Sequence, residues 1–147
     1  TSARRSRISQ PAARSTSAYA MVREQFGLPI GSFEGVRERL ARIAGHAYFM
    51  NAARRLAFGA VDAGEKPSVI SAIVKAYLTE GSRLCINDAM DIHAGSAICR
   101  GPGNILARPY FSIPVGITVE GATPSLNAVM PCYKRARAII PPVQSWA

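Results

Sequence analysis

The sequence has few cysteines, few aromatic residues and no long apolar run. Its 147 residues include three cysteines, an odd number without a C-x-x-C spacing, which favours a reducing compartment over a disulfide framework. Aromatic residues make up only 7% of the chain. Uncharged stretches such as 43–53 and 109–119 are shorter than the roughly 18 apolar residues of a membrane-spanning helix. We therefore expect no transmembrane segment and at most a peripheral association with membranes.

Acidic residues are missing from both ends of the chain. Residues 1–20 contain four arginines and residues 121–147 contain Lys134, Arg135 and Arg137, whereas 21–120 contain 11 basic and 9 acidic residues. Most of the net charge of +9 therefore lies in the ends, and the central part has the mixed charge of an ordinary solvated surface. The basic ends alone would suit nucleic-acid binding, which stays as the weakest of three alternatives.

What the sequence does contain is material for one folded domain, with 48% hydrophobic residues. Apolar residues recur at steps of three and four from Val36 to Val61, which predicts a long amphipathic helix ending at Gly64. Ser32 is the expected N-cap, and Glu34 would lie in the first turn. A shorter helix is expected at 18–26, closed by Gly27 and Pro29.

A second long helix is predicted from about Ser68 to Met90, antiparallel to the first because the link is short. Gly81 is a weak point in its interior. The positions expected to face inward are Ile70, Ile73, Tyr77, Leu84 and Ile92. The prediction is an all-α, antiparallel up-and-down helical bundle.

Glycine and proline recur every few residues after Ile92, which predicts a long Gly/Pro-rich loop. Beyond Gly121, four further prolines exclude a long helix. We therefore divide the chain into a basic, disordered tail at 1–17, a helical domain at 18–122 and a divergent Pro-rich tail at 123–147.

Three kinds of site are disfavoured by motif and spacing. His46 and His93, even with Asp88 and Asp91 nearby, match no known ligand spacing, so no metal is expected. The string G-S-A-I-C-R-G-P-G-N at 95–104 fits neither a P-loop nor a dinucleotide-binding fingerprint. No serine or cysteine has the surroundings of a catalytic nucleophile.

Three short strings remain: V-R-E-Q-F-G-L-P-I-G at 22–31, D-A-M-D-I-H-A-G at 88–95 and I-T-V-E-G at 117–121. In this order, with two amphipathic helices between the first and second, they resemble the C-terminal helical domain of the flavin-dependent acyl-coenzyme A dehydrogenases. The chain is most similar to the bacterial long-chain branch of fatty-acid β-oxidation. The strings that carry this similarity are F-E-G-V at 33–36, L-A-R-I-A-G at 40–45, E-K-P-S-V at 65–69, S-A-I-V-K at 71–75 and I-T-V-E-G-A at 117–122.

The resemblance implies a site for FAD. Its R-x-Q-F-G segment places Arg23 and Gln25 at the cofactor, where a guanidinium suits the pyrophosphate oxygens. Its Q-x-x-G-G loop corresponds to 91–95, where Asp91 replaces an amide and Ala94 replaces a glycine that allows close backbone approach. The expected cofactor-binding residues are Arg23, Gln25, Asp91, His93, Ala94, Gly95 and Gly121.

Glu120 lies at the position of the family's catalytic carboxylate. The resemblance implies that it removes the α-proton of a fatty acyl-CoA thioester while hydride leaves the β-carbon, giving a trans-2-enoyl-CoA. A weakly acidic α-proton requires a base with a raised pKa in a dry site, and Ile117 and Val119 supply apolar neighbours. The family also implies a homo-oligomer formed through the bundle, a separate electron-carrier protein, and a location in the bacterial cytoplasm.

The resemblance stops near 18 and 122, where the composition changes abruptly. We expect truncation or a shifted reading frame at the ends. Because the substrate and flavin contacts of the family's other domains are missing, we expect the isolated chain to lack turnover. The second alternative is therefore a non-catalytic helical interaction fragment, ranked ahead of a nucleic-acid binder.

Overall fold

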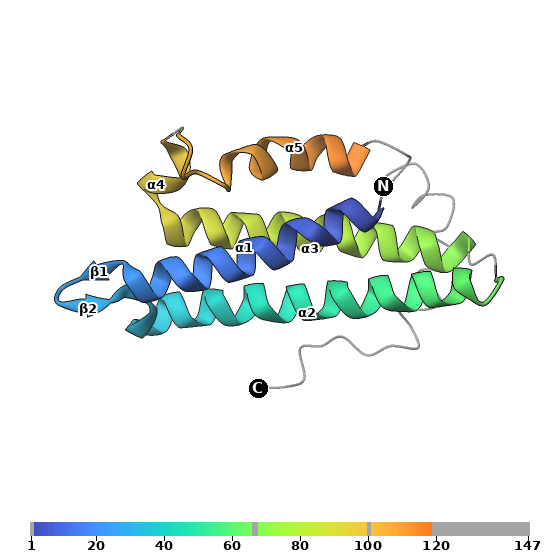
Figure 1. The fold of residues 1–147 in the computed structure, drawn as a ribbon, viewed down its shortest axis with the longest axis horizontal. Helices are drawn as coiled ribbons and strands as arrows, with labels where there is room; N and C mark the ends of the chain where they lie inside the picture. Colours follow the sequence, from blue (N-terminus) through green and yellow to red (C-terminus); the bar gives the residue numbers. More distant parts are fainter. Residues whose placement is uncertain (1, 66–67, 100, 119–147) are drawn as a thin grey trace.

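The computed structural model describes residues 2–65, 68–99 and 101–118, and it places three long helices next to one another (Figure 1). A small hairpin joins the first two helices, and two shorter helices follow the third. In chain order the elements are α1 (Ser2–Val22), β1 (Glu24–Gln25), β2 (Leu28–Pro29), the 3-10 turn η1 (Ile30–Ser32), α2 (Glu34–Asp62), α3 (Ser68–His93), α4 (Gly95–Ile98) and α5 (Ala107–Thr118).

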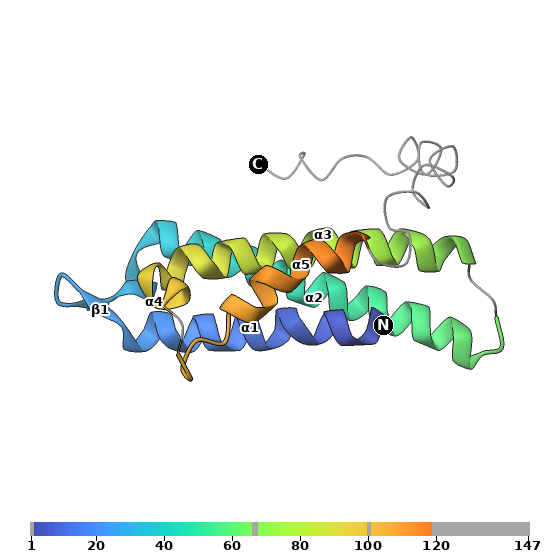
Figure 2. The ribbon, with the colours of Figure 1, turned by 90° about the horizontal axis from the view of Figure 1, so that it is seen from above.

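The helices α1, α2 and α3 run antiparallel in succession, and α5 crosses over α3 (Figures 1 and 2). The hairpin projects from one end of the bundle, beside the end of α3 (Figure 2). This arrangement confirms the predicted all-α antiparallel bundle. Within the described ranges, no helix combines the length and the apolar character needed to cross a membrane.

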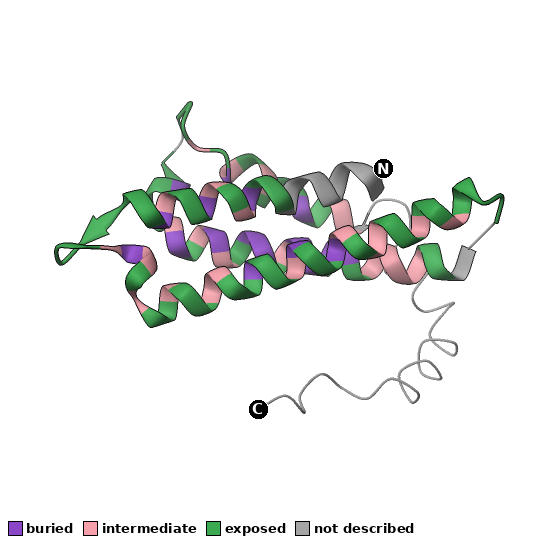
Figure 3. Cartoon of the chain, turned by 60° about the horizontal axis from the view of Figure 1, so that its bottom comes forward, coloured by how far each residue is buried: buried purple, intermediate pink, exposed green. Residues whose placement is uncertain are grey.

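The core lies where the three long helices meet (Figure 3). Ile43 and Met50 of α2 and Leu78 and Ile86 of α3 are almost fully buried. Their steps of seven and eight residues keep them on one side of each helix, as a helical period requires. Leu106, just before α5, is also buried and belongs to the same core.

The expected disordered tail at 1–17 is wrong, because residues 2–17 belong to α1. Ala12, Thr16 and Ala20 are buried at steps of four along this helix. Arginine and alanine favour a helix, and small side chains at steps of four allow α1 to pack closely against the bundle. A stripe of small residues has little hydrophobic contrast, so the pattern of apolar residues did not reveal it.

The predicted helix at 18–26 and the predicted N-cap of the next helix also need correction. The helix expected to reach residue 26 ends at Val22, and a two-residue hairpin follows. At its turn, Phe26 has φ 53° and Gly27 has φ 76°, the positive values of a type I′ turn. Ser32 does not cap α2, since Phe33 holds the N-cap position without a side-chain hydrogen bond. Glu34 lies in the first turn as predicted.

On α3, Ile92 is buried as expected, but Ile70, Tyr77 and Leu84 are about half exposed. The buried stripe instead follows Leu78, Cys85, Ile86, Ala89 and Ile92. Gly81 is buried on the same side, and a Cβ atom there would lie 3.2 Å from the sulfur of Met50. The glycine therefore makes room for a methionine that fills the core.

The long loop expected after Ile92 contains two helices, α4 and α5. The side chain of Asn104 organises the segment between them. Its Oδ1 accepts from the backbone N–H groups of Leu106 (3.0 Å) and Ala107 (2.9 Å), and its Nδ2 donates to the carbonyls of Ala97 (2.6 Å) and Cys99 (2.9 Å). The amide thus supplies the N-terminal cap of a helix whose prolines had suggested a loop.

Candidate functional site

A pocket of about 740 Å³ opens at the hairpin end of the bundle. It lies where the end of α1, the hairpin, the start of α2 and the end of α3 meet. The cofactor-binding residues predicted from the resemblance and described by the structure all line it, namely Arg23, Gln25, Asp91, His93, Ala94 and Gly95. Glu120 and Gly121, the remaining predicted site residues, lie outside the described residues.

The hairpin fixes the position of Arg23 and Gln25. The backbone N–H of Arg23 donates to the carbonyl of Tyr19 at 2.8 Å, and the carbonyl of Arg23 accepts from the N–H of Ile30 at 2.8 Å. Gln25 pairs with Leu28 across the type I′ turn. Arg23 is exposed and forms no ion pair with any residue the structure describes. Its guanidinium is therefore available to an anion in the pocket.

The end of α3 also lines the pocket, and Ala94 at this end has an unusual backbone conformation. Its φ of 48° and ψ of −126° lie in a region that favours glycine. The turn is held by a hydrogen bond from the N–H of Ala94 to the carbonyl of Met90 at 2.8 Å and by one from Ser96 Oγ to the carbonyl of His93 at 2.7 Å. A glycine at position 94 would adopt this conformation without the strain that alanine bears.

His93 packs its ring against Tyr19 of α1, with centroids 4.1 Å apart and an interplanar angle of 17°. Burial lowers the pKa of His93 below its ordinary value of 6.5, so the imidazole is neutral at pH 7. Its Nε2 atom is buried and has no hydrogen-bond partner among the described residues. A buried polar atom without a partner in the described part of the chain is therefore present in a residue that lines the pocket.

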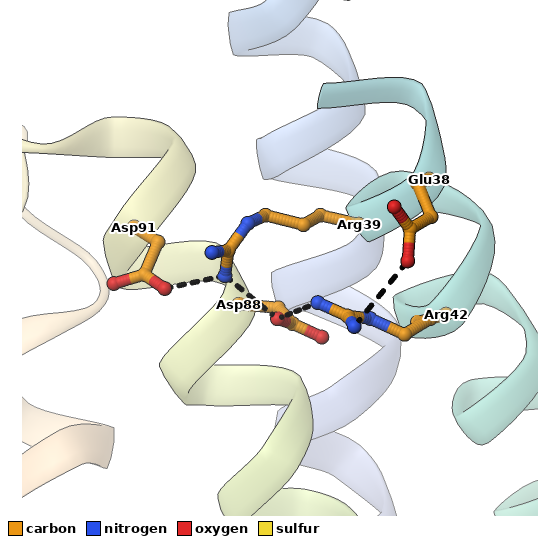
Figure 4. Close-up of polar contacts among 5 residues, drawn as sticks. All are labelled: Glu38, Arg39, Arg42, Asp88 and Asp91. Atoms are coloured by element: carbon orange, nitrogen blue, oxygen red, sulfur yellow. Dashed lines mark hydrogen bonds and ion pairs between the residues drawn. The ribbon is translucent and has the colours of Figure 1, made fainter. Parts of the chain in front are cut away.

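Asp91 belongs to an ion-pair network between α2 and α3 (Figure 4). Arg39 of α2 pairs with Asp91, and the same nitrogen lies 3.1 Å from Asp88 Oδ1. Arg42 also reaches Asp88 Oδ1, at 2.8 Å, and lies 3.6 Å from Glu38. Both arginines and both aspartates are three residues apart, so each pair shares one helix face. In the part of the chain described, no group of three His, Cys, Asp or Glu side chains could hold a metal ion.

Tyr19 and Arg39 also line the pocket, and the sequence analysis missed both. Tyr19 lies at the end of a helix whose first part had been assigned to a disordered tail. Arg39 belongs to none of the short strings that indicated the site. The signal for Arg39 was its i,i+3 spacing to Arg42, which matches the spacing of Asp88 and Asp91 on the antiparallel helix.

Comparison with known proteins identifies the family of this fold and pocket. The family model for the acyl-CoA dehydrogenase C-terminal domain matches residues 1–126. The chain belongs to the acyl-CoA dehydrogenase family. The match begins at residue 1, before the boundary expected at 18, in agreement with the helix α1.

Relatives of this acyl-CoA dehydrogenase domain differ in their substrates. The 3-(aryl)acrylate reductase of Clostridium sporogenes is 33% identical over 91 residues, covering 60% of this chain and 23% of the reductase. The glutaryl-coenzyme A dehydrogenase in its glutaryl-CoA complex is 26% identical, with a TM-score of 0.76 over 92% of this chain and 34% of that structure. The acyl-CoA dehydrogenase from Geobacillus kaustophilus superposes with a TM-score of 0.80 at 21% identity, over 88% of this chain and 34% of that structure.

These shares show that the dehydrogenase chain spans about a quarter of its curated relative and a third of the structures. The names of the relatives do not single out the long-chain branch within the family. The substrate of the present domain is therefore a separate question from its family.

Proposed function

We propose that this chain is the C-terminal helical domain of an FAD-dependent acyl-CoA dehydrogenase that converts fatty acyl-CoA thioesters to trans-2-enoyl-CoA. The observation that carries the proposal is the convergence of the 23–25 and 91–95 segments on one pocket. These segments lie far apart in the sequence and correspond to the two strings that the resemblance assigns to flavin contact, with departures at Asp91 and Ala94.

The residues of this pocket fit a flavin dinucleotide. FAD carries two linked phosphates, which require hydrogen-bond donors and positive charge. Arg23 offers a guanidinium without an ionic partner among the described residues, and Gln25 offers an amide. Tyr19 and Phe26 add aromatic surface to the pocket.

In the proposed reaction Glu120 takes the α-proton of the acyl thioester. When bound, FAD supplies the acceptor for the hydride that leaves the β-carbon. A carboxylate base for such a weak acid must be shielded from water. Ile117, just upstream of Glu120, packs against the core, so the segment that leads to the base is anchored to the bundle.

Several finer features belong to this proposal. The strings at 33–36, 65–69 and 117–122 support a long-chain substrate and a role in bacterial fatty-acid β-oxidation. A cytoplasmic location, a homo-oligomer formed through the bundle and a separate electron-carrier protein follow from the same branch of the family. Because the domain spans about a third of the related structures, turnover should require the domains that cover the substrate.

The test is flavin retention by an assembled protein. The chain is combined with the N-terminal and middle domains of a long-chain acyl-CoA dehydrogenase and FAD, then freed of unbound flavin by gel filtration. We expect retained FAD, and Arg23→Gln should weaken its binding about tenfold, as loss of a charged hydrogen bond implies. Arg14→Gln is the matched control, because Arg14 is exposed on α1 and does not line the pocket.

A second measurement tests Glu120, the proposed catalytic base. Glu120→Gln should keep FAD in the assembled protein but abolish conversion of a long-chain acyl-CoA, because the base is lost. A colourless assembly that binds neither FAD nor acyl-CoA would contradict the proposal. That outcome would favour the non-catalytic helical fragment, for which the exposed Val22, Phe26 and Tyr48 offer apolar contact surface.

A further inference from the structure

Arg39 connects the ion-pair network of the bundle to the wall of the candidate site. It is the member of the network from α2 that lines the pocket, and Asp91 is the member from α3. We propose that Arg39 is a positioning residue that holds the last turn of α3 and neutralises Asp91, so that the pocket accepts a diphosphate. This inference rests on the proposed function, since the ligand is a phosphate-bearing nucleotide.

Arg39 is placed to hold the last turn of α3. Asp91 lies two residues before His93 and three before Ala94, within the last turn of α3. Ala94 must be held in a conformation that alanine rarely adopts, and its only described backbone donor contact is to Met90, one residue before Asp91. By tying Asp91 to α2, Arg39 fixes the turn from which His93 and Ala94 extend. The ion pair between Arg39 and Asp91 therefore supports the turn that lines the pocket.

Arg39 also changes the charge of the pocket, because it pairs with a carboxylate that lines it. Among the residues that the structure describes, the charged side chains lining the pocket are Arg23, Arg39 and Asp91. A free carboxylate at Asp91 would oppose a diphosphate within the same pocket, because like charges at short range repel. The ion pair with Arg39 offsets much of that charge, and the guanidinium of Arg23 has no ionic partner among the described residues. Asp91, which replaces a neutral amide in the family pattern, is thus compatible with an anionic ligand.

Arg42 provides a matched control within the same network. It contacts Asp88 Oδ1 at 2.8 Å and Glu38 at 3.6 Å, but it does not contact Asp91 and does not line the pocket. Arg39 and Arg42 are similarly exposed, at 39% and 48% of their side chains. A general loss of the contact between α2 and α3 should therefore affect both variants, and a local role should affect Arg39 alone.

The first experiment measures hydrogen exchange of the backbone amides at 92–97 in the full 147-residue chain, without any ligand. Arg39→Met should speed this exchange about fivefold, in keeping with a partly exposed ion pair, and Arg42→Met should change it less than twofold. Asp91→Asn should act like Arg39→Met because it breaks the same pair from the other side. Unchanged exchange in Arg39→Met, or an equal change in Arg42→Met, would overturn the claim that Arg39 holds the last turn of α3.

The second experiment titrates the FAD-competent assembly of the previous section with FAD, adenosine diphosphate and adenosine. Arg39→Met should weaken FAD and adenosine diphosphate about fivefold without affecting adenosine, and Arg39→Lys should retain most of the affinity. The double variant Arg39→Met/Asp91→Asn should recover adenosine diphosphate affinity relative to Arg39→Met, because both charges are then removed. Equal weakening of adenosine, or no recovery in the double variant, would overturn the electrostatic role.

The two experiments separate the two claims. If the wild-type assembly binds neither FAD nor adenosine diphosphate, the proposed function and the electrostatic role both fail. The exchange measurement still decides whether Arg39 holds the turn, because it needs no ligand. If FAD binds and only the Arg39 results disagree, the proposed function stands and the role of Arg39 is wrong.

Discussion

Replacing Ala94 with glycine should stabilise the protein, although glycine normally destabilises. Ala94 has φ 48° and ψ −126°, a conformation that costs an L-residue about 1–3 kcal/mol. Glycine removes this strain but loses about 0.4–1 kcal/mol through the greater freedom of the unfolded chain. Ala94 is exposed, so its methyl group contributes little packing. We therefore expect the free energy of unfolding to rise by about 1 kcal/mol, which is roughly fivefold in the folding equilibrium constant.

Urea unfolding followed by circular dichroism measures this gain as a shift of the midpoint at unchanged slope. The control is the same chemical change at Ala52, an exposed position inside α2, where Ala52→Gly should cost about 1 kcal/mol. The two substitutions should therefore have opposite signs. A loss of stability in Ala94→Gly as large as that in Ala52→Gly would refute the assignment of strain to this turn.

Three further predictions follow from buried or capping groups. Asn104→Ala should lower the free energy of unfolding, measured in urea, by about 2 kcal/mol, because it removes the cap of α5 and two donor bonds. Asn104→Asp keeps the accepting oxygen and should lower the free energy of unfolding by less. Burial, with a smaller effect of Asp88, raises the pKa of Cys85 to about 12. Iodoacetamide near pH 8 should therefore label the exposed Cys99 and reach Cys85 only on unfolding. Rapid labelling of Cys85 in the folded protein would contradict this prediction. Because burial lowers the pKa of His93, the native state should lose stability as pH falls below 6.5. His93→Gln should reduce the decrease in the free energy of unfolding between about pH 8 and pH 5. Identical pH profiles of the unfolding free energy in the two proteins would exclude this contribution.

The two long helices could be predicted because large apolar residues mark their buried faces. Ile43 and Met50 on α2 lie on the stripe that the spacing identified. The first helix was missed because Ala12 and Thr16 provide its contact face, and small side chains give a weak hydrophobic pattern.

The helix α5 was missed because Pro109 and Pro114 normally interrupt helices. Pro109 lies in the first turn, where a backbone N–H has no partner within the helix. Ile113 and Ile117, four residues apart, carry the helical spacing that was overlooked.

The site was predicted from its resemblance to a family, not from the spacing of apolar residues. That resemblance selected Arg23, Gln25 and the 91–95 segment, and the structure brings them to one pocket. It did not select Tyr19 or Arg39, because neither belongs to a short motif. Their places depend on how α1 and α2 pack against the end of α3, which a local string of residues does not encode.

The most direct test of the account is a crystal structure of the assembled protein with FAD. We expect the diphosphate to lie within hydrogen-bond distance of the Arg23 guanidinium and beside the turn at 93–95. Bound FAD that contacts neither segment would contradict the assignment of this pocket, whatever the activity of the assembly.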